Sequence, residues 1–389
     1  MKIAIITSRF PYPLEKGDKL RLYNHIKLLS REHEIYLFSV SSDSLSQTDI
    51  DHVSQYVEEL FIFKQSRFSK IKNLLLHGMR MPFQVAYYYD RNIRKKITEI
   101  IGDRSCDLIY NHLVRTAEYT RSINEIPKVI DYMDAFSVGM KKRADGCKIP
   151  LKWVYNIESS KMKKYERKIY PFFKFHTLIS EIDAKHIGSD LDFQIVKNGV
   201  DLVHFSADRR NARFEIGFVG NMGYLPNVIA VKYMVKEILP LLNPRYKLLV
   251  AGARPAPVLK KMSDDRVYVT GYLDDIRNAY RSIKILVAPI FKGTGMQNKI
   301  LEAMASGIPV ITSTIVNKSI GATPDEEIFI SDDPERYVEI IEHLLNDSTI
   351  YEQISQNAIN FVESKYSWDF QNKKLEHIIN EFRSRNNKS

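Results

Sequence analysis

The chain of 389 residues has only two cysteines, Cys106 and Cys147, and neither belongs to a CxxC motif. Two isolated cysteines supply no disulfide framework and no zinc site of the usual spacing. No run approaches the roughly 20 apolar residues that a spanning helix requires. The opening residues MKIAIITSRFPYP turn polar and proline-rich too early for a signal peptide. We therefore expect a cytoplasmic protein without a metal ion.

Several nucleotide and nucleic-acid signatures are also missing. The loop after the first apolar run, SRFPYPLEKGDKLR at 8–21, is neither a GxGxxG fingerprint nor a GxxxxGK[ST] phosphate loop. A nicotinamide-dependent dehydrogenase and a P-loop nucleotidase are accordingly disfavoured. No RRM signature or zinc finger accompanies the formal net charge of +10, so nucleic acid is a weak candidate partner.

Short apolar runs alternate with helix-like stretches in two series, which predicts buried parallel strands joined by right-handed crossovers. The first series has strands at 2–7, 34–40, 107–113 and 128–134, with a helix from about Lys19 to Arg31. The second begins near Glu215, with strands at 215–220, 246–252, 266–271, 283–290, 308–313 and 327–331. The fold class is therefore α/β, with two Rossmann-like doubly wound domains.

The two series meet near 196–205, where Asn198-Gly199 supplies turn chemistry. We expect an N-terminal domain at 1–197 that binds the acceptor and a second domain at 198–367 that binds the donor. A last segment, 368–389, begins at Trp368 and is expected to be a helix that crosses back to the first domain.

In parallel sheets, ligands bind beyond the carboxyl ends of the strands. Three such loops draw attention: 8–21, in which Gly17 starts a helix; 218–227, in which Gly220 and Gly223 let backbone amides approach a diphosphate; and 288–313. The third has a glycine turn followed by a helix that carries Lys299 and Glu302. Lys299 adds positive charge near the phosphates, and Glu302 suits the ribose hydroxyls; alternatively, these two residues simply pair on the helix face.

These loops resemble a known family, the family-four retaining glycosyltransferases of the GT-B fold, also called glycosyl transferases group 1. The resemblance covers nearly the whole chain. The patterns KGDKxR at 16–21, GNMxYxPN at 220–227 and QNKxLEAM at 297–304 are similar to a subgroup associated with exopolysaccharide sugar transfer. The resemblance implies two domains that face a central cleft.

The resemblance also implies roles for individual residues. Glu302 would bind ribose, Lys299 and the amides at 295–297 would contact diphosphate or sugar, and the backbone near Gly271 and Tyr272 would meet a uracil or guanine base. The implied donor-binding set is Gly17, Gly220, Asn221, Gly223, Tyr272, Thr294, Gly295, Met296, Gln297, Asn298 and Glu302. Two positions depart from the family pattern: Thr294 replaces the first Glu of E-x7-E, and Asn221 stands where a nearby Arg is usual.

Three residues are candidates for catalysis. Lys299 would stabilise charge on the leaving diphosphate without metal. His112 and Asp134 each follow a strand and are expected to project into the cleft. The resemblance puts His112 near the donor sugar, although a hydrogen-bonded structural histidine is the alternative; Asp134 is either an acceptor-orienting base or a helix cap. Asp190-Leu191-Asp192 resembles a metal-binding DxD but is interpreted as a surface turn.

Two basic stretches suggest a partner surface. Residues 64–98 carry nine Lys/Arg and one acid, and residues 141–174 carry eleven Lys/Arg and three acids, interleaved with apolar and aromatic residues. An anionic membrane and an ordinary solvated helix face both fit this pattern.

The expected partners are a UDP- or GDP-linked sugar, which is a co-substrate rather than a cofactor, and a glycan or lipid-linked acceptor. The expected activity is sugar transfer in surface-polysaccharide synthesis at the cytoplasmic side of a membrane. A nucleotide-sugar epimerase and a non-catalytic nucleotide-sugar-binding partner subunit remain as alternatives.

Overall fold

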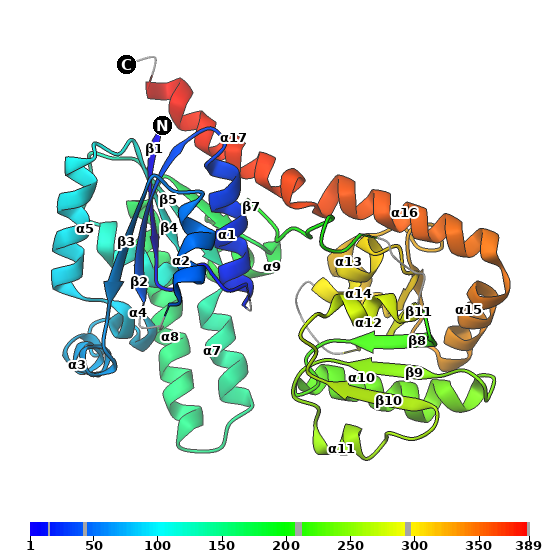
Figure 1. Cartoon of the computed structure of the whole chain (residues 1–389). Coiled ribbons are helices and arrows are strands. Elements are labelled where there is room, and N and C mark those ends of the chain that lie inside the picture. Colours follow the sequence, from blue (N-terminus) through cyan, green and yellow to red (C-terminus); the bar gives the residue numbers. More distant parts are fainter. Residues whose placement is uncertain (15, 42–44, 207–211, 292–296, 387–389) are drawn as a thin grey trace. The chain divides into compact units, whose positions relative to one another are not determined.

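The computed structural model describes residues 1–14, 16–41, 45–206, 212–291 and 297–386. The chain divides into two compact units (Figure 1), which are described separately below. The first unit comprises Met1–Asn198 and Gln371–Ser389, and the second comprises Gly199–Phe370. The boundary falls between Asn198 and Gly199, the two residues at which the sequence predicted a turn.

The first unit contains a seven-stranded sheet in the order β3-β2-β1-β4-β5-β6-β7, and every neighbouring pair is parallel. The strands are β1 Lys2–Thr7, β2 Glu34–Ser41, β3 Glu59–Lys64, β4 Leu108–His112, β5 Lys128–Met133, β6 Phe175–Leu178 and β7 Gln194–Ile195. This order, in which the chain reverses direction across the sheet between β1 and β4, is that of a doubly wound fold.

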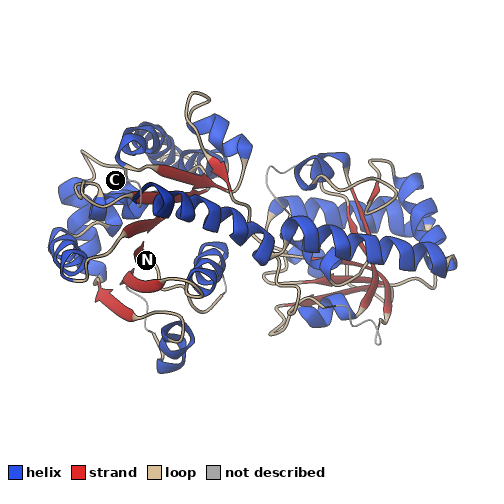
Figure 2. Cartoon of the chain, turned by 90° about the horizontal axis from the view of Figure 1, so that it is seen from above, coloured by secondary structure: helices blue, strands red, loops and turns tan. Residues whose placement is uncertain are grey.

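Helices lie on both faces of this sheet (Figure 2). They are α1 Gly17–Leu29, α2 Gln47–Ser54, α3 Arg67–His77, α4 Phe83–Tyr88, α5 Arg91–Asp103, α6 Ala117–Thr120, α7 Phe136–Asp145, α8 Leu151–Ile169 and α9 Glu181–Ile187, with short 3-10 turns η1 Val114–Thr116 and η2 Tyr170–Phe172. Because both faces are covered, β1 is buried on both sides: Ile3 and Ile5 join one core cluster, while Ala4 and Ile6 join another.

The last helix, α17 Trp368–Asn386, contributes to the core of the first unit. Its side chains Leu375, Ile379 and Phe382 are buried in the same cluster as Ile3 and Ile5. The α17 segment from Gln371 onward is thus an integral part of the first unit, although residues 199–370 separate it from the rest of that unit in the sequence.

The second unit has a six-stranded parallel sheet in the order β10-β9-β8-β11-β12-β13. Its strands are β8 Phe214–Val219, β9 Leu248–Ala251, β10 Val267–Gly271, β11 Ile283–Ala288, β12 Val310–Thr312 and β13 Phe329–Ile330. Its helices are α10 Leu225–Tyr233, η3 Met234–Ile238, η4 Leu239–Leu241, α11 Pro257–Lys260, α12 Arg277–Arg281, α13 Asn298–Ala305, α14 Thr314–Ile320, α15 Pro334–Asn346 and α16 Ser348–Tyr366. The predicted fold class, two doubly wound parallel sheets, is confirmed.

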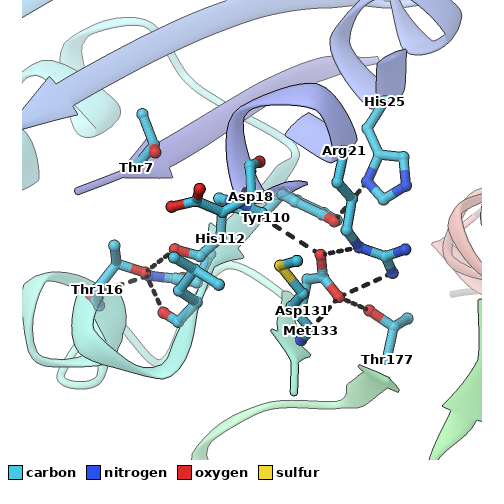
Figure 3. A network of polar contacts seen from close by, with 12 residues as sticks. Thr7, Asp18, Arg21, His25, Tyr110, His112, Thr116, Asp131, Met133 and Thr177 are labelled. Carbon is cyan, nitrogen blue, oxygen red and sulfur yellow. Dashed lines mark hydrogen bonds and ion pairs between the residues drawn. The ribbon is translucent and has the colours of Figure 1, made fainter. Parts of the chain in front are cut away.

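A buried ion pair ties α1 to the first sheet (Figure 3). Arg21 and Asp131 have fully buried side chains, and Arg21 Nε donates to Asp131 Oδ2 at 2.7 Å while Nη2 donates to Oδ1 at 3.0 Å. Thr177 on β6 donates its hydroxyl to Asp131 Oδ1 at 2.8 Å, and Arg21 Nη1 donates to Asn198 Oδ1 at 3.1 Å. Burial alone would raise the pKa of Asp131, but the Arg21 charge outweighs it and holds that pKa well below its usual value.

Arg21→Met should destabilise the first unit strongly, because it leaves the Asp131 carboxylate buried without its countercharge. We expect a loss of about 3–5 kcal/mol of unfolding free energy, measured by urea unfolding followed by circular dichroism. The matched control is Lys95→Met, which removes one end of an exposed ion pair with Glu99 on α5 and should cost no more than about 1 kcal/mol. Equal losses in the two variants would contradict the structural role of the buried pair.

Candidate functional site

The two sheets each have a switch point at which ligands are expected. In the first sheet it lies between β1 and β4, and in the second between β8 and β11. The loops that follow β1, β8 and β11 are the ones that the sequence singled out at 8–21, 218–227 and 288–313. Each unit therefore presents its own candidate site at the carboxyl edge of its sheet.

In the second unit, Lys299 lies at the start of α13 and reaches the loop after β8. Its Nζ donates to Asn227 Oδ1 at 2.6 Å and lies 4.6 Å from the centre of the Phe218 ring. Burial lowers the pKa of Lys299 to about 8, although the Glu302 carboxylate opposes the shift. The amine thus changes its charge in a pH range close to neutrality.

Glu302 lies one turn further along α13 and has a different partner. Tyr280 on α12 donates its hydroxyl to Glu302 Oε2 at 2.7 Å. Burial raises the pKa of Glu302, while the Tyr280 hydrogen bond and the Lys299 charge act in the opposite direction. Lys299 and Glu302 thus bond to different residues, Asn227 and Tyr280. The alternative in which these two side chains simply pair with each other on the helix face does not describe their contacts. A carboxylate fixed by Tyr280 is suited to accept hydrogen bonds from a pair of hydroxyls.

The glycine loop after β8 is more tightly bonded than the sequence suggested. The Gly220 amide donates to Ala251 O at 3.0 Å, and the Gly223 amide donates to Asn221 Oδ1 at 3.0 Å. The expectation that amides of these glycines are open to a diphosphate is corrected here, since the neighbouring strand end and the Asn221 side chain occupy them. Because the Oδ1 atom of Asn221 already accepts this hydrogen bond, the Nδ2 group is the part of the side chain that could donate a hydrogen bond to a ligand.

The ends of β8 and β9 approach each other so closely that glycine is required there. A Cβ atom on Gly252, at the end of β9, would lie 1.8 Å from the Gly220 carbonyl oxygen, and Gly252 has a φ of +140°. A Cβ on Gly220 would lie 3.2 Å from Lys299 Nζ. Close packing of the two strand ends thus brings the loop backbone against the lysine.

The other predicted donor residues lie around this site or outside the described residues. Tyr272 is 71% exposed and follows Gly271, whose φ is +79°. Gln297 is the N-cap of α13 and Asn298 is its first residue. Thr294, Gly295 and Met296 lie outside the described residues, so the predicted roles of their amides and side chains stay predictions.

In the first unit, His112 is the last residue of β4 and is buried, with only 2% of its surface exposed. Its Nε2 lies 3.1 Å from the Asp18 carbonyl oxygen, and its Nδ1 lies 3.4 Å from Asp131 Oδ2 (Figure 3). The ring is therefore buried between Asp18 of α1 and Asp131 of β5, and its expected projection into a cleft stays a prediction. A catalytic role for His112 stays a prediction.

Asp134 follows β5. Part of its surface is exposed to solvent, but the surrounding protein still desolvates the carboxyl group enough to change its pKa. Desolvation by the surrounding protein, followed by repulsion from the Asp183 carboxylate, raises the pKa of Asp134 to about 6. The N-cap of α7 is Ala135 rather than Asp134, so the capping alternative does not apply. A carboxylate with this pKa is suited to general base chemistry near neutral pH.

Asp134 and Gly17 line a cavity of about 590 Å³, here called the strand-end cavity. Its other charged residues are Arg9, Asp18, Arg115, Arg143 and Glu158, and most of the remaining lining is apolar or aromatic. None of the three arginines belongs to a motif that marks it as a site residue in the sequence. Arg115 lies in the short segment VRT between β4 and α6, which carries no hydrophobic pattern or motif to mark it.

The basic, aromatic-rich stretches divide into surface and core. Phe68, Leu75, Leu76, Met79, Trp153 and Phe172 are exposed, whereas Tyr165 and Phe173 are buried. A groove beside them is lined by Arg80, Arg121, Lys161, Lys164 and Lys168, together with Met79 and Glu118. Among the described residues no helix is long and apolar enough to cross a membrane.

In the part of the chain that the structure describes, no group of three or more His, Cys, Asp or Glu side chains is arranged so that it could hold a metal ion. The Asp190-Leu191-Asp192 segment instead makes surface contacts. Asp190 pairs with Arg167 at 2.7 Å, and the Asp192 carbonyl accepts from the Tyr170 hydroxyl at 2.8 Å. This is consistent with its interpretation as a surface turn.

Comparison with known proteins bears on both units. The profile of the family described as "Glycosyl transferases group 1" matches residues 213–347, which lie within the second unit. Over nearly the whole chain, the protein is similar to an "Uncharacterized 44.6 kDa protein in cps region" of Klebsiella pneumoniae, with 21% identity over 398 residues that cover 94% of this chain and 96% of the relative.

Two further similarities come from a capsule protein and a solved structure. "Capsular polysaccharide biosynthesis glycosyltransferase CapM" of Staphylococcus aureus is 26% identical over 206 residues, covering 48% of this chain and 53% of CapM. The structure of Alr3699/HepE of Anabaena in complex with UDP has a TM-score of 0.66 and 14% identity, covering 98% of this chain and 100% of that chain. Residues 213–347 thus match the family of glycosyl transferases group 1, and the chain has the GT-B fold.

Proposed function

We propose that this protein is a retaining glycosyltransferase that moves a sugar from a UDP- or GDP-linked donor to a glycan or lipid-linked acceptor in the synthesis of a surface polysaccharide. The observation that carries the proposal is the placement of Lys299 and Glu302 within the group 1 domain. Both stand on α13, beside the loop after β8, and each is oriented by its own partner, Asn227 or Tyr280. A fixed cation and a fixed carboxylate about one helical turn apart match the diphosphate and ribose of one nucleotide.

The relatives support the donor class and the pathway context. HepE of Anabaena was solved with UDP and with UDP-glucose, and the two bacterial relatives carry names that refer to capsule genes or capsule synthesis. We extend these properties to this chain as part of the proposal.

In the proposed reaction, the acceptor oxygen forms a bond to the anomeric carbon of the donor sugar, and the bond from that carbon to the diphosphate breaks. The acceptor proton passes to the leaving diphosphate. Lys299 stabilises the negative charge that develops on the diphosphate, so the chain needs no metal ion for this task. Asp134 orients the acceptor hydroxyl, and His112 helps to position the loop that begins α1 through its contact with Asp18.

We also propose that the protein works at the cytoplasmic face of a membrane, held there by peripheral contact. On α3, Phe68, Leu75 and Leu76 are exposed while Lys70 and Asn73 are buried, so the apolar side of this helix faces solvent. The groove of cations around Lys161 and Lys164 lies next to the exposed Met79. Exposed apolar side chains beside clustered cations suit an anionic lipid surface.

A nucleotide screen tests the donor site. UDP, GDP, ADP and CDP are compared by thermal unfolding of the full chain, where a ligand at about 100 times its Kd adds about 2.7 kcal/mol of stability. We expect UDP or GDP to stabilise the protein. Glu302→Gln should weaken that binding by about tenfold or more, because a neutral amide replaces a charged acceptor for ribose.

Glu339→Gln on α15 is the matched control for charge removal, since its side chain is exposed and pairs only with Arg336 among the contacts of the described residues. If no nucleotide stabilises the protein, or if both Glu variants bind equally well, the donor site is misplaced. Nucleotide binding without any sugar transfer in the presence of lipid-linked or glycan acceptors would support the non-catalytic partner subunit instead. Epimerised nucleotide sugar as the product would support the epimerase.

The Lys299 amine predicts a pH dependence. Its pKa of about 8 in the unbound protein means that the charge is present at pH 7 and mostly lost at pH 9. Affinity for UDP or GDP should therefore fall by roughly tenfold between these two values, as the protonated fraction falls. Isothermal titration calorimetry at several pH values measures this slope.

Lys299→Met should bind weakly at all pH values and show a nearly flat profile. Lys318→Met, which removes an exposed lysine on α14, should keep the wild-type slope. A parent protein whose nucleotide affinity does not change from pH 7 to pH 9 would argue against contact between Lys299 and the diphosphate.

A further inference from the structure

The strand-end cavity has a positively charged corner that the proposed donor chemistry does not use. Arg115 is 4% exposed, and its guanidinium lies 4.5 Å from the centre of the Tyr88 ring and 3.5 Å from Asp18 Oδ2. Its Nε is buried and has no hydrogen-bond partner among the described residues. A buried, charged N–H group that is left unbonded is costly, so this corner is prepared for an acceptor atom from a ligand.

Two further arginines converge on the same corner. Arg9 Nη1 donates to Asp18 Oδ2 at 2.8 Å, and the exposed Arg143 on α7 also lines the cavity. Burial lowers the pKa of Arg115 to about 10, and repulsion from Arg9 and Arg143 acts in the same direction. Two guanidinium groups thus share the single Asp18 carboxylate, which leaves an excess of positive charge at this corner.

The pKa of Tyr88 is also affected by the positive charge at this corner. Burial alone would raise the pKa of its phenol, yet the charges of Arg115 and Arg9 outweigh burial and lower that pKa. The other two acids of the lining, Asp134 and Glu158, form no ion pair with these arginines among the described residues. The Glu158 carboxylate instead accepts from the backbone amides of Phe83 and Gln84 at 2.7 and 2.8 Å.

Away from this corner the wall of the cavity becomes apolar. Leu74 of α3, Phe83 of α4, Met140 of α7 and Val154 of α8 line the cavity. Next to Leu74 and Val154 in the sequence lie side chains that face solvent, including Leu75 at 76% and Trp153 at 66% exposure. Both α3 and α8 therefore carry apolar side chains in the cavity wall and, at neighbouring positions in the sequence, on the surface.

The hydroxyl groups of a free oligosaccharide would find no hydrogen-bond partner on the Leu74, Phe83, Met140 and Val154 side chains. A phosphate ester on a long apolar chain matches both parts of the lining, with charge-assisted hydrogen bonds at the arginines and burial of the chain along the helices. Such a molecule also belongs to the membrane surface that the exposed side of α3 favours.

We propose that the strand-end cavity binds the phosphate of a lipid-linked acceptor, with the phosphate at Arg115, Arg9 and Arg143 and the chain along α3 and α8. The proposal rests on the proposed glycosyltransferase function and selects the lipid-linked acceptor over the free glycan. Arg115, through its free Nε, makes the central contact. The exposed Arg143, on α7, adds a third guanidinium group to the lining of this corner.

The test uses the full-length chain and dodecyl phosphate below its critical micelle concentration, with binding measured by isothermal titration calorimetry. Inorganic phosphate supplies the anion without a chain, and dodecyl maltoside supplies the chain without an anion. We expect dodecyl phosphate to bind at least about tenfold more tightly than either. Arg143→Gln and Arg115→Gln should each weaken it by about tenfold, which corresponds to the loss of one charge-assisted hydrogen bond.

The matched control is Lys152→Gln, an exposed cation on α8 that does not line the cavity, and it should change the affinity less than twofold. Arg143 is exposed, so its variant serves as the decisive one if Arg115→Gln fails to fold. Equal weakening in Arg143→Gln and Lys152→Gln would overturn the proposal in favour of general surface attraction. Equal affinity for inorganic phosphate would overturn it in favour of a simple anion site.

UDP and GDP binding separates this inference from the proposed function. The arginine variants should keep the nucleotide affinity of the parent, and a loss of nucleotide affinity instead of dodecyl phosphate affinity would overturn the inference by assigning the cavity to the donor. Nucleotide binding without dodecyl phosphate binding would overturn the inference and leave the proposed function standing. Dodecyl phosphate binding that depends on Arg143, in a protein that binds no nucleotide, would reject the proposed function while supporting the lipid-phosphate site.

Discussion

The buried contact between Arg21 and Asp131 is the constraint on which the first unit depends. A carboxylate in the middle of an apolar strand is tolerable only if a countercharge is fixed beside it, and α1 brings that countercharge. The pair sets how α1 lies against the sheet. Since α1 begins at Gly17 and carries Asp18, the same contact fixes the arginine corner of the strand-end cavity, where Asp18 meets Arg9 and Arg115.

Each unit buries a cation beside its candidate site, but the two cations differ in pKa. In the second unit, burial lowers the pKa of Lys299 to about 8, so this amine loses its charge when the pH rises only slightly above neutrality. In the first unit, Arg115 keeps its charge at any physiological pH because its pKa remains near 10. The proposed donor site is therefore expected to be sensitive to pH, whereas the proposed acceptor site is expected to be sensitive mainly to the presence of a phosphate.

The sequence predicted the sheets well because buried parallel strands are continuous apolar runs: 2–7 coincides with β1, and α13 begins one residue before Lys299. It missed β3, whose residues are only partly buried, and the two short strands β6, with four residues, and β7, with two. At the candidate sites, residue identities were readable from motifs but hydrogen-bond partners were not. The Gly220 amide is taken by Ala251 from another strand, and the burial of Arg115 is set by Tyr88 and Asp18, all of which are distant in sequence.

The position of α17 has a consequence for how the chain reaches its native state. Since Leu375, Ile379 and Phe382 complete the core around Ile3 and Ile5, the second unit is in topological terms an insertion within the first. A ribosome synthesises the whole of the second unit before it makes the helix that completes the first. The earlier-made unit must therefore wait with an uncovered apolar face, and the order of synthesis is the reverse of the order in which the two units can finish folding.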